Sequence, residues 1–133
     1  MNKILSLAAL TLLAASTAGL AHAAPGPGTA ELVLSVSAAD AGRTEAVLLS
    51  CPAGPGAGHV ERARACADLA EAGGDFDALH ALPRPAGTPA CVAGNDPVVA
   101  TATGTYQGRP VDWTRSYAHT CALQADTASL FLF

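Results

Sequence analysis

The residues CPAGPGAGHVERARACADLAEAGGDFDAL, numbers 51–79, contain the best helix candidate of this sequence. Gly and Pro interrupt the first eight of them too often for a regular element. Residues 60–72 are rich in Ala, Glu and Arg, which favour helices, and Gly73-Gly74 provides a C-terminal stop. A short helical turn is expected at 75–82, with Asp75 as its cap. The predicted buried face of the main helix contains Cys66, Leu69 and Ala70.

Alternating patterns on both sides of this helical region predict strands. Residues 31–37 place Leu32, Leu34 and Val36 on one apolar face. Val33 is an apolar residue on the otherwise polar second face. A second subunit that covers this face would explain its presence. Further strands are expected at 45–50, 97–105, 109–118 and 129–133, with a hairpin loop at 40–43 and an ambiguous segment, compatible with a helical turn, at 120–127.

The predicted order of elements is β-β-α-β-β-β. Short loops between the later strands imply antiparallel pairing. A sheet with a helix across one face is the economical packing of such elements. We therefore expect an α+β fold, with an antiparallel sheet of about five strands and one main helix and a short second helix on one face.

The first 23 residues have the features of a secretory signal peptide. Lys3 precedes an apolar stretch at 4–20, and Ala21-His22-Ala23 forms a cleavage site. The stretch is short for a membrane span and contains Ser, Thr and Gly, which argues against a membrane anchor. We expect a secreted protein with a flexible mature terminus at 24–30 and one domain at 31–133.

Composition narrows the possible partners and chemistry. The net charge is −4 and no basic cluster is present, which argues against nucleic acid as a partner. An even number of cysteines in an exported chain predicts two disulfides, and no pair has the C-x-x-C spacing that is typical of zinc sites. The spacing leaves all three pairings open. The four cysteines are Cys51, Cys66, Cys91 and Cys121.

No enzyme motif is found. The sequence lacks G-x-S-x-G, and no two histidines stand at a metal-ligand spacing such as i, i+4. Asp75 and Asp77 are better explained as a helix cap and a solvated face than as an acid–base pair. We expect neither catalytic activity nor a cofactor.

The stretch TPACVAGNDPVV, residues 88–99, is the candidate functional segment. It places Cys91 shortly before a Gly-Asn turn signal, and Asp96-Pro97 leads into a predicted strand. Taken by residue type alone, an ordinary disulfide-tethered loop explains this pattern as well.

Several strings together resemble the Streptomyces-type subtilisin inhibitor family over residues 30–133. They are CADLAEAGGDFDAL after CPAGPGAGH, then CVAGNDPV, YQGRPV and the closing SLFLF. The resemblance implies a secreted α+β protein, usually a homodimer, that inhibits serine proteases by the substrate-like standard mechanism. It also implies disulfides Cys51–Cys66 and Cys91–Cys121. Closing a loop of about 15 residues stabilises by roughly 3 kcal/mol, and a loop of about 30 by a few tenths more.

The resemblance places the scissile bond at Ala93–Gly94, with Ala93 entering the primary pocket of the protease. Proteases bind substrate as an extended strand, and a loop already held in that shape avoids most of the ordering cost. The protease supplies the attacking serine, so the inhibitor needs no catalytic group. The predicted protease-binding residues are Cys91, Val92, Ala93, Gly94 and Asn95, supported by Asp96, Pro97 and His119.

This loop departs from the family pattern. Relatives commonly have Met, Lys or Arg in place of Ala93 and Pro in place of Val92. Alanine suits the apolar pockets of subtilisin-like or elastase-like enzymes and argues against trypsin. Gly94 adds backbone freedom, and His119 stands where the family often has Asn. We hypothesise weaker or narrower inhibition than is typical; the alternative is a non-inhibitory secreted binding module on the same fold.

Overall fold

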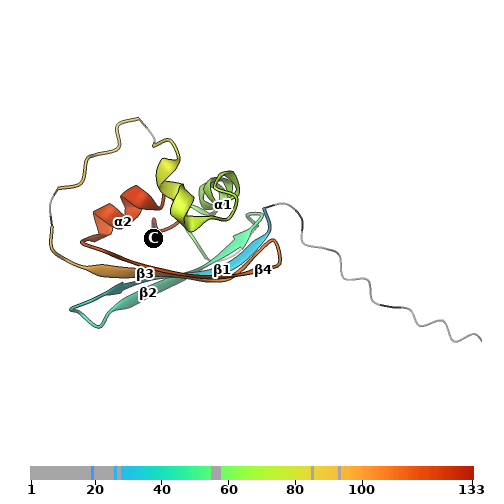
Figure 1. Cartoon of the computed structure of the whole chain (residues 1–133), viewed down its shortest axis with the longest axis horizontal. Coiled ribbons are helices and arrows are strands. Elements are labelled where there is room, and N and C mark those ends of the chain that lie inside the picture. Colours follow the sequence, from blue (N-terminus) through green and yellow to red (C-terminus); the bar gives the residue numbers. More distant parts are fainter. Residues whose placement is uncertain (1–18, 20–25, 27, 55–57, 85, 93) are drawn as a thin grey trace, which may run out of the picture.

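The computed structural model describes residues 19, 26, 28–54, 58–84, 86–92 and 94–133 of the 133-residue chain. It contains a four-stranded antiparallel sheet in the order β2-β1-β3-β4, with its helices packed on one face (Figure 1). The predicted α+β fold is therefore confirmed. The strands are β1 (Ala30–Ala38), β2 (Thr44–Cys51), β3 (Val98–Tyr106) and β4 (Arg109–Tyr117); the helices are α1 (Arg62–Glu71), the 3-10 helix η1 (Phe76–Ala81) and α2 (Thr120–Asp126).

The helix-facing side of the sheet follows the predicted alternation. Leu32 and Leu34 of β1 are fully buried, and their partners on β3 are Gly104 and Ala102. A side chain at position 104 would overlap the carbonyl of Glu31, so only glycine allows the two strands to pair there. Ala100 and Ala102 of β3 are fully buried, so the helix-facing side of this strand carries small side chains.

The buried face of helix α1 is rotated from the predicted one. Ala65 and Leu69 are buried, whereas Ala70, predicted to be buried, is exposed. The disulfide between Cys66 and Cys51 joins the helix to β2. Gly74 ends the helix as predicted: its N–H donates to the Leu69 carbonyl at 2.9 Å, with backbone dihedrals that favour glycine.

The predicted fifth strand at 129–133 is wrong. After α2 the chain turns, and Leu130 and Phe131 are buried between the helices and the sheet. Asp68 of α1 holds this turn, because its Oδ2 accepts hydrogen bonds from the Ser129 N–H (3.1 Å) and hydroxyl (2.5 Å). Alternating Leu and Phe suggested a strand, but these residues fill the core and do not pair with a sheet edge.

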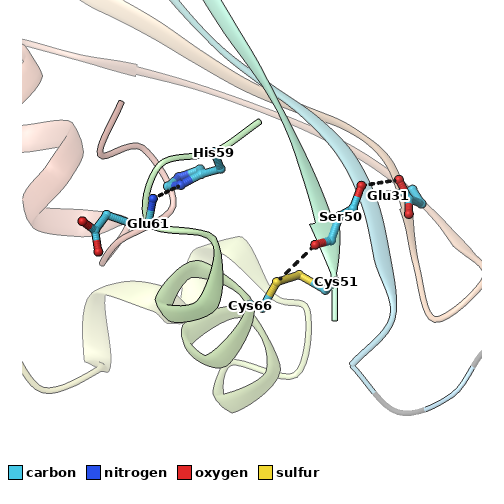
Figure 2. Close-up of a disulfide and its surroundings, with 6 residues drawn as sticks. All are labelled: Glu31, Ser50, Cys51, His59, Glu61 and Cys66. Atoms are coloured by element: carbon cyan, nitrogen blue, oxygen red, sulfur yellow. Dashed lines mark hydrogen bonds between the residues drawn. A yellow bond between two sulfur atoms is a disulfide. The ribbon is translucent and has the colours of Figure 1, made fainter. Parts of the chain in front are cut away.

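His59 joins the loop before α1 to the same C-terminal turn, and Figure 2 shows its hydrogen bond with Glu61 on the side of that loop. Its side chain is only 2% exposed. Nδ1 accepts the Glu61 N–H at 3.0 Å, so Nε2 carries the proton and donates to the Leu130 carbonyl at 2.7 Å. The ring also meets Phe133 edge-on, with centroids 5.7 Å apart. A buried histidine with both nitrogens satisfied is a structural residue.

We expect His59→Ala to lower the free energy of unfolding by about 2–3 kcal/mol, because the Glu61 N–H and the Leu130 carbonyl lose their buried partner. Denaturant unfolding followed by circular dichroism measures the change. The control is His80→Ala, since His80 is exposed and its hydrogen bond to the Asp77 carbonyl lies at the surface. That control should stay within about 0.5 kcal/mol of the parent. Equal stability of the two variants would contradict the structural role of His59.

Candidate functional site

The connection between η1 and β3 leaves the body of the protein as one long loop (Figure 1). Its described residues at 86–92 and 94–96 are all exposed and lie outside regular helix and strand. Val92 is 87% exposed. Ala93 lies outside the described residues. An apolar side chain held in solvent is the opposite of what core packing would favour, so this segment is available to a partner.

A disulfide fixes the loop on its N-terminal side. Cys91 is joined to Cys121, with Cα atoms 5.6 Å apart, and Cys51 is joined to Cys66. Both predicted pairings are therefore confirmed. Cys121 lies in the first turn of α2, where Leu123 is fully buried. The bridge thus connects an exposed segment to a helix that is anchored in the core.

The C-terminal side of the loop is fixed by the sheet. The Pro97 carbonyl accepts the N–H of Ala39 at 3.0 Å, just beyond the end of β1. The next residue, Val98, is buried at the start of β3. The carboxylate of Asp96, which was predicted to support the loop, makes no hydrogen bond or ion pair with any described residue. Ala39 was missed from the sequence because a backbone amide leaves no residue signal.

His119 lies beside the loop and also begins α2. Its Nδ1 accepts the N–H of Ala122 at 3.1 Å, which caps the helix. A Cβ placed on Gly94 would lie 3.7 Å from three carbons of His119. His119 therefore lies next to the loop at Gly94, while its Nδ1 is engaged with α2.

A polar cluster fixes η1, from which the loop departs. Asp77 accepts a hydrogen bond from Trp113 Nε1 at 3.0 Å and pairs with Arg115 at 3.2 Å. Phe76 stacks on the Trp113 ring, with centroids 5.3 Å apart. These contacts hold η1 against β4, so the loop starts from an element that is packed on the sheet.

Tyr117 ends β4, two residues before His119. Its phenolic oxygen is buried and has no hydrogen-bond partner in the described part of the chain. Burial raises the pKa of Tyr117, and the Arg115 guanidinium offsets part of that rise. The phenol therefore stays neutral at physiological pH and serves as packing surface.

The described residues hold no group of three His, Cys, Asp or Glu side chains that could bind a metal ion. None of their helices is long and apolar enough to cross a bilayer. All four cysteines are in disulfides. What remains is an exposed loop held at both ends, whose geometry suits recognition by a partner.

The model of the family described as subtilisin inhibitor-like matches residues 28–119. The chain belongs to the subtilisin inhibitor-like family. "Subtilisin inhibitor" of Streptomyces albogriseolus is 38% identical over 130 residues, covering 90% of this chain and 88% of the relative. "Subtilisin inhibitor-like protein 7" of Streptomyces ambofaciens is 42% identical over 106 residues, covering 77% and 94%.

A solved structure supports the same assignment. Streptomyces caespitosus sermetstatin, in complex with Bacillus licheniformis subtilisin, superposes with a TM-score of 0.59 and 31% identity, covering 80% of this chain and all of that one. The subtilisin inhibitor-like family is a family of protease inhibitors and not of enzymes.

Gly94 offers a direct test of loop stiffness in this family member. Its backbone is not in the left-handed region, and a Cβ would make an ordinary contact with His119. We therefore expect Gly94→Ala to tighten inhibition of subtilisin about two- to fivefold by reducing the freedom of the unbound loop. Inhibition constants from enzyme titration measure this.

The matched control is Gly87→Ala in the same loop. Gly87 has φ +82, where alanine is strained, so this change should lower stability without tightening inhibition. Weaker inhibition by Gly94→Ala than by the parent would contradict the proposed stiffening.

Proposed function

We propose that the protein inhibits subtilisin-like serine proteases by presenting residues 91–95 as a substrate, with Ala93–Gly94 as the reactive bond. The observation that carries this proposal is the exposed loop held on both sides of that bond, by Cys91–Cys121 before it and by Pro97–Ala39 after it. The complex of the related sermetstatin with subtilisin supports the choice of protease class.

The two anchors explain why such a loop would inhibit and not simply be digested. The protease serine attacks the Ala93 carbonyl carbon, and the carbon–nitrogen bond to Gly94 breaks as the amine takes a proton from the protease histidine. An ordinary product then diffuses away. Here the Gly94 amine stays close, because the chain after it is fixed to β1 and β3. The amine can attack the acyl-enzyme and re-form the bond.

Residues around the reactive bond set the preference among proteases. Ala93 carries no charge and little bulk, so it suits the apolar primary pockets of subtilisin-like and elastase-like enzymes. Trypsin, which needs a cation in that pocket, is disfavoured. His119 uses Nδ1 to cap α2, so only Nε2 remains to donate a hydrogen bond to the loop. This differs in reach from the asparagine that the family often has here, so we expect weaker inhibition than is typical.

The proposed site of action is extracellular. The features of a signal peptide at residues 1–23 support export, although that segment, apart from Gly19, lies outside the described residues. Two disulfides join elements of the inhibitory domain at 31–133, and disulfides persist in oxidising environments outside the cytosol. Export would also bring the loop to secreted proteases.

We expect Ala93→Lys to convert the protein into a trypsin inhibitor, because a cation would then enter the primary pocket. A panel of subtilisin, elastase, chymotrypsin and trypsin measures the change, and trypsin inhibition should improve at least 100-fold. The control is Ala90→Lys, an exposed position in the same loop before Cys91. Trypsin inhibition that does not improve, or that improves equally for both variants, would mean that the reactive bond lies elsewhere.

A cleavage experiment with subtilisin separates an inhibitor from a binding module. Incubation with subtilisin should cut the parent slowly at one bond, leaving two products joined by Cys91–Cys121. Rapid degradation throughout the chain would favour the non-inhibitory module.

We also propose that the protein forms a homodimer through the face of the sheet opposite the helices. Val33 and Leu48 lie opposite each other there and are 47% and 49% exposed. Around them, hydroxyls bond to one another across strands, as in Ser35 with Thr101 at 2.6 Å. A face of paired hydroxyls around two exposed apolar side chains suits a second copy of itself.

We expect Val33→Glu to convert the dimer into a monomer, because two symmetry-related charges would be buried against each other. Sedimentation equilibrium measures the mass of the parent and the variant. The control is Val60→Glu, since Val60 is 77% exposed and lies on the helical side of the sheet, just before α1. A parent that is monomeric at micromolar concentration would overturn the dimer.

A further inference from the structure

A cavity of about 360 Å³, partly open to solvent, is lined by α1, η1, α2, the loop and the C-terminal turn. Its floor is apolar: Leu79 is buried, while Leu82 and Leu132 keep part of their surface accessible. The bridge Cys91–Cys121 forms part of one wall. This volume lies within the range of about 300–1,000 Å³ that small-molecule sites occupy.

The charged groups at the cavity favour an anion. Arg64 from α1 and Arg84 from the loop both line it, and neither makes an ion pair or hydrogen bond with a described residue. Asp68 is the opposing charge, but its Oδ2 already accepts two hydrogen bonds from Ser129. Two guanidiniums that have no partner among the described residues, beside one carboxylate, leave a net positive charge at a cavity whose floor is apolar.

We propose that this cavity binds a small amphipathic carboxylate, such as a medium-chain fatty acid. The hydrocarbon chain would lie against Leu79, Leu82 and Leu132, and the carboxylate would accept hydrogen bonds from Arg64 and Arg84. Guanidinium is suited to this role because its N–H groups match the geometry of a carboxylate. A chain of this kind satisfies both features of the cavity, whereas a purely polar anion would leave the leucines uncovered.

Decanoate, below its aggregation concentration, is the probe. Titration into the isotope-labelled protein, without any protease, should give saturable one-to-one shifts of the methyl signals of Leu79, Leu82 and Leu132. Decanol, with the same chain and no charge, should bind about tenfold more weakly. The double variant Arg64→Gln/Arg84→Gln should weaken decanoate about tenfold and leave decanol unchanged. The matched control, Arg43→Gln, lies in the exposed hairpin between β1 and β2 and should bind decanoate as the parent does.

Several results would overturn the proposal. Shifts that do not saturate, or that spread over the surface and miss the three leucines, would show that the cavity is not a site. Decanol binding as tightly as decanoate, or a double variant that binds decanoate normally, would show that the two arginines do not select a carboxylate. If Arg43→Gln weakened decanoate binding equally, the effect of the double variant would come from the overall charge of the protein and not from the cavity. None of these measurements depends on inhibition, so the proposal stands or fails apart from the function of the loop.

Discussion

The bridge between Cys91 and Cys121 is the constraint on which the functional part of this molecule depends. On one side of it is a segment fully exposed to solvent, and on the other is the first turn of α2. An exposed chain has little packing of its own, so its shape must be imposed from elsewhere. The disulfide restrains the segment through α2, a helix whose Leu123 is fully buried.

Helix α2 has only seven residues, so it also needs support from its surroundings. His119 caps its first turn, and the chain that follows it is held by Asp68 and His59 from the region of α1. Cys51–Cys66 in turn joins α1 to β2. The loop is therefore connected to the sheet by a continuous series of contacts, and both disulfides belong to it.

Features that depend on residues close together in the sequence could be predicted from it. The helix end at Gly73-Gly74 and the cap at Asp75 are of this kind, as is the alternation of β1. The pairing of the cysteines came from the family resemblance, since spacing alone leaves three possibilities. Residues 129–133 were misassigned because alternation of apolar residues does not distinguish a strand from a buried turn. The roles of His59 and Asp68 could not be seen, since their partners are 71 and 61 positions away and include backbone groups.

Trp113 can serve as an intrinsic fluorescence probe of the scaffold. It is the only tryptophan of the chain, and it lies half-buried between Phe76 of η1 and Phe131 of the C-terminal turn, with ring centroids 5.3 and 5.8 Å away. Its indole emission therefore reports, without any label, whether these two segments are docked on β4. Because the exposed loop lies outside this aromatic group, fluorescence can follow the integrity of the scaffold separately from events at the loop.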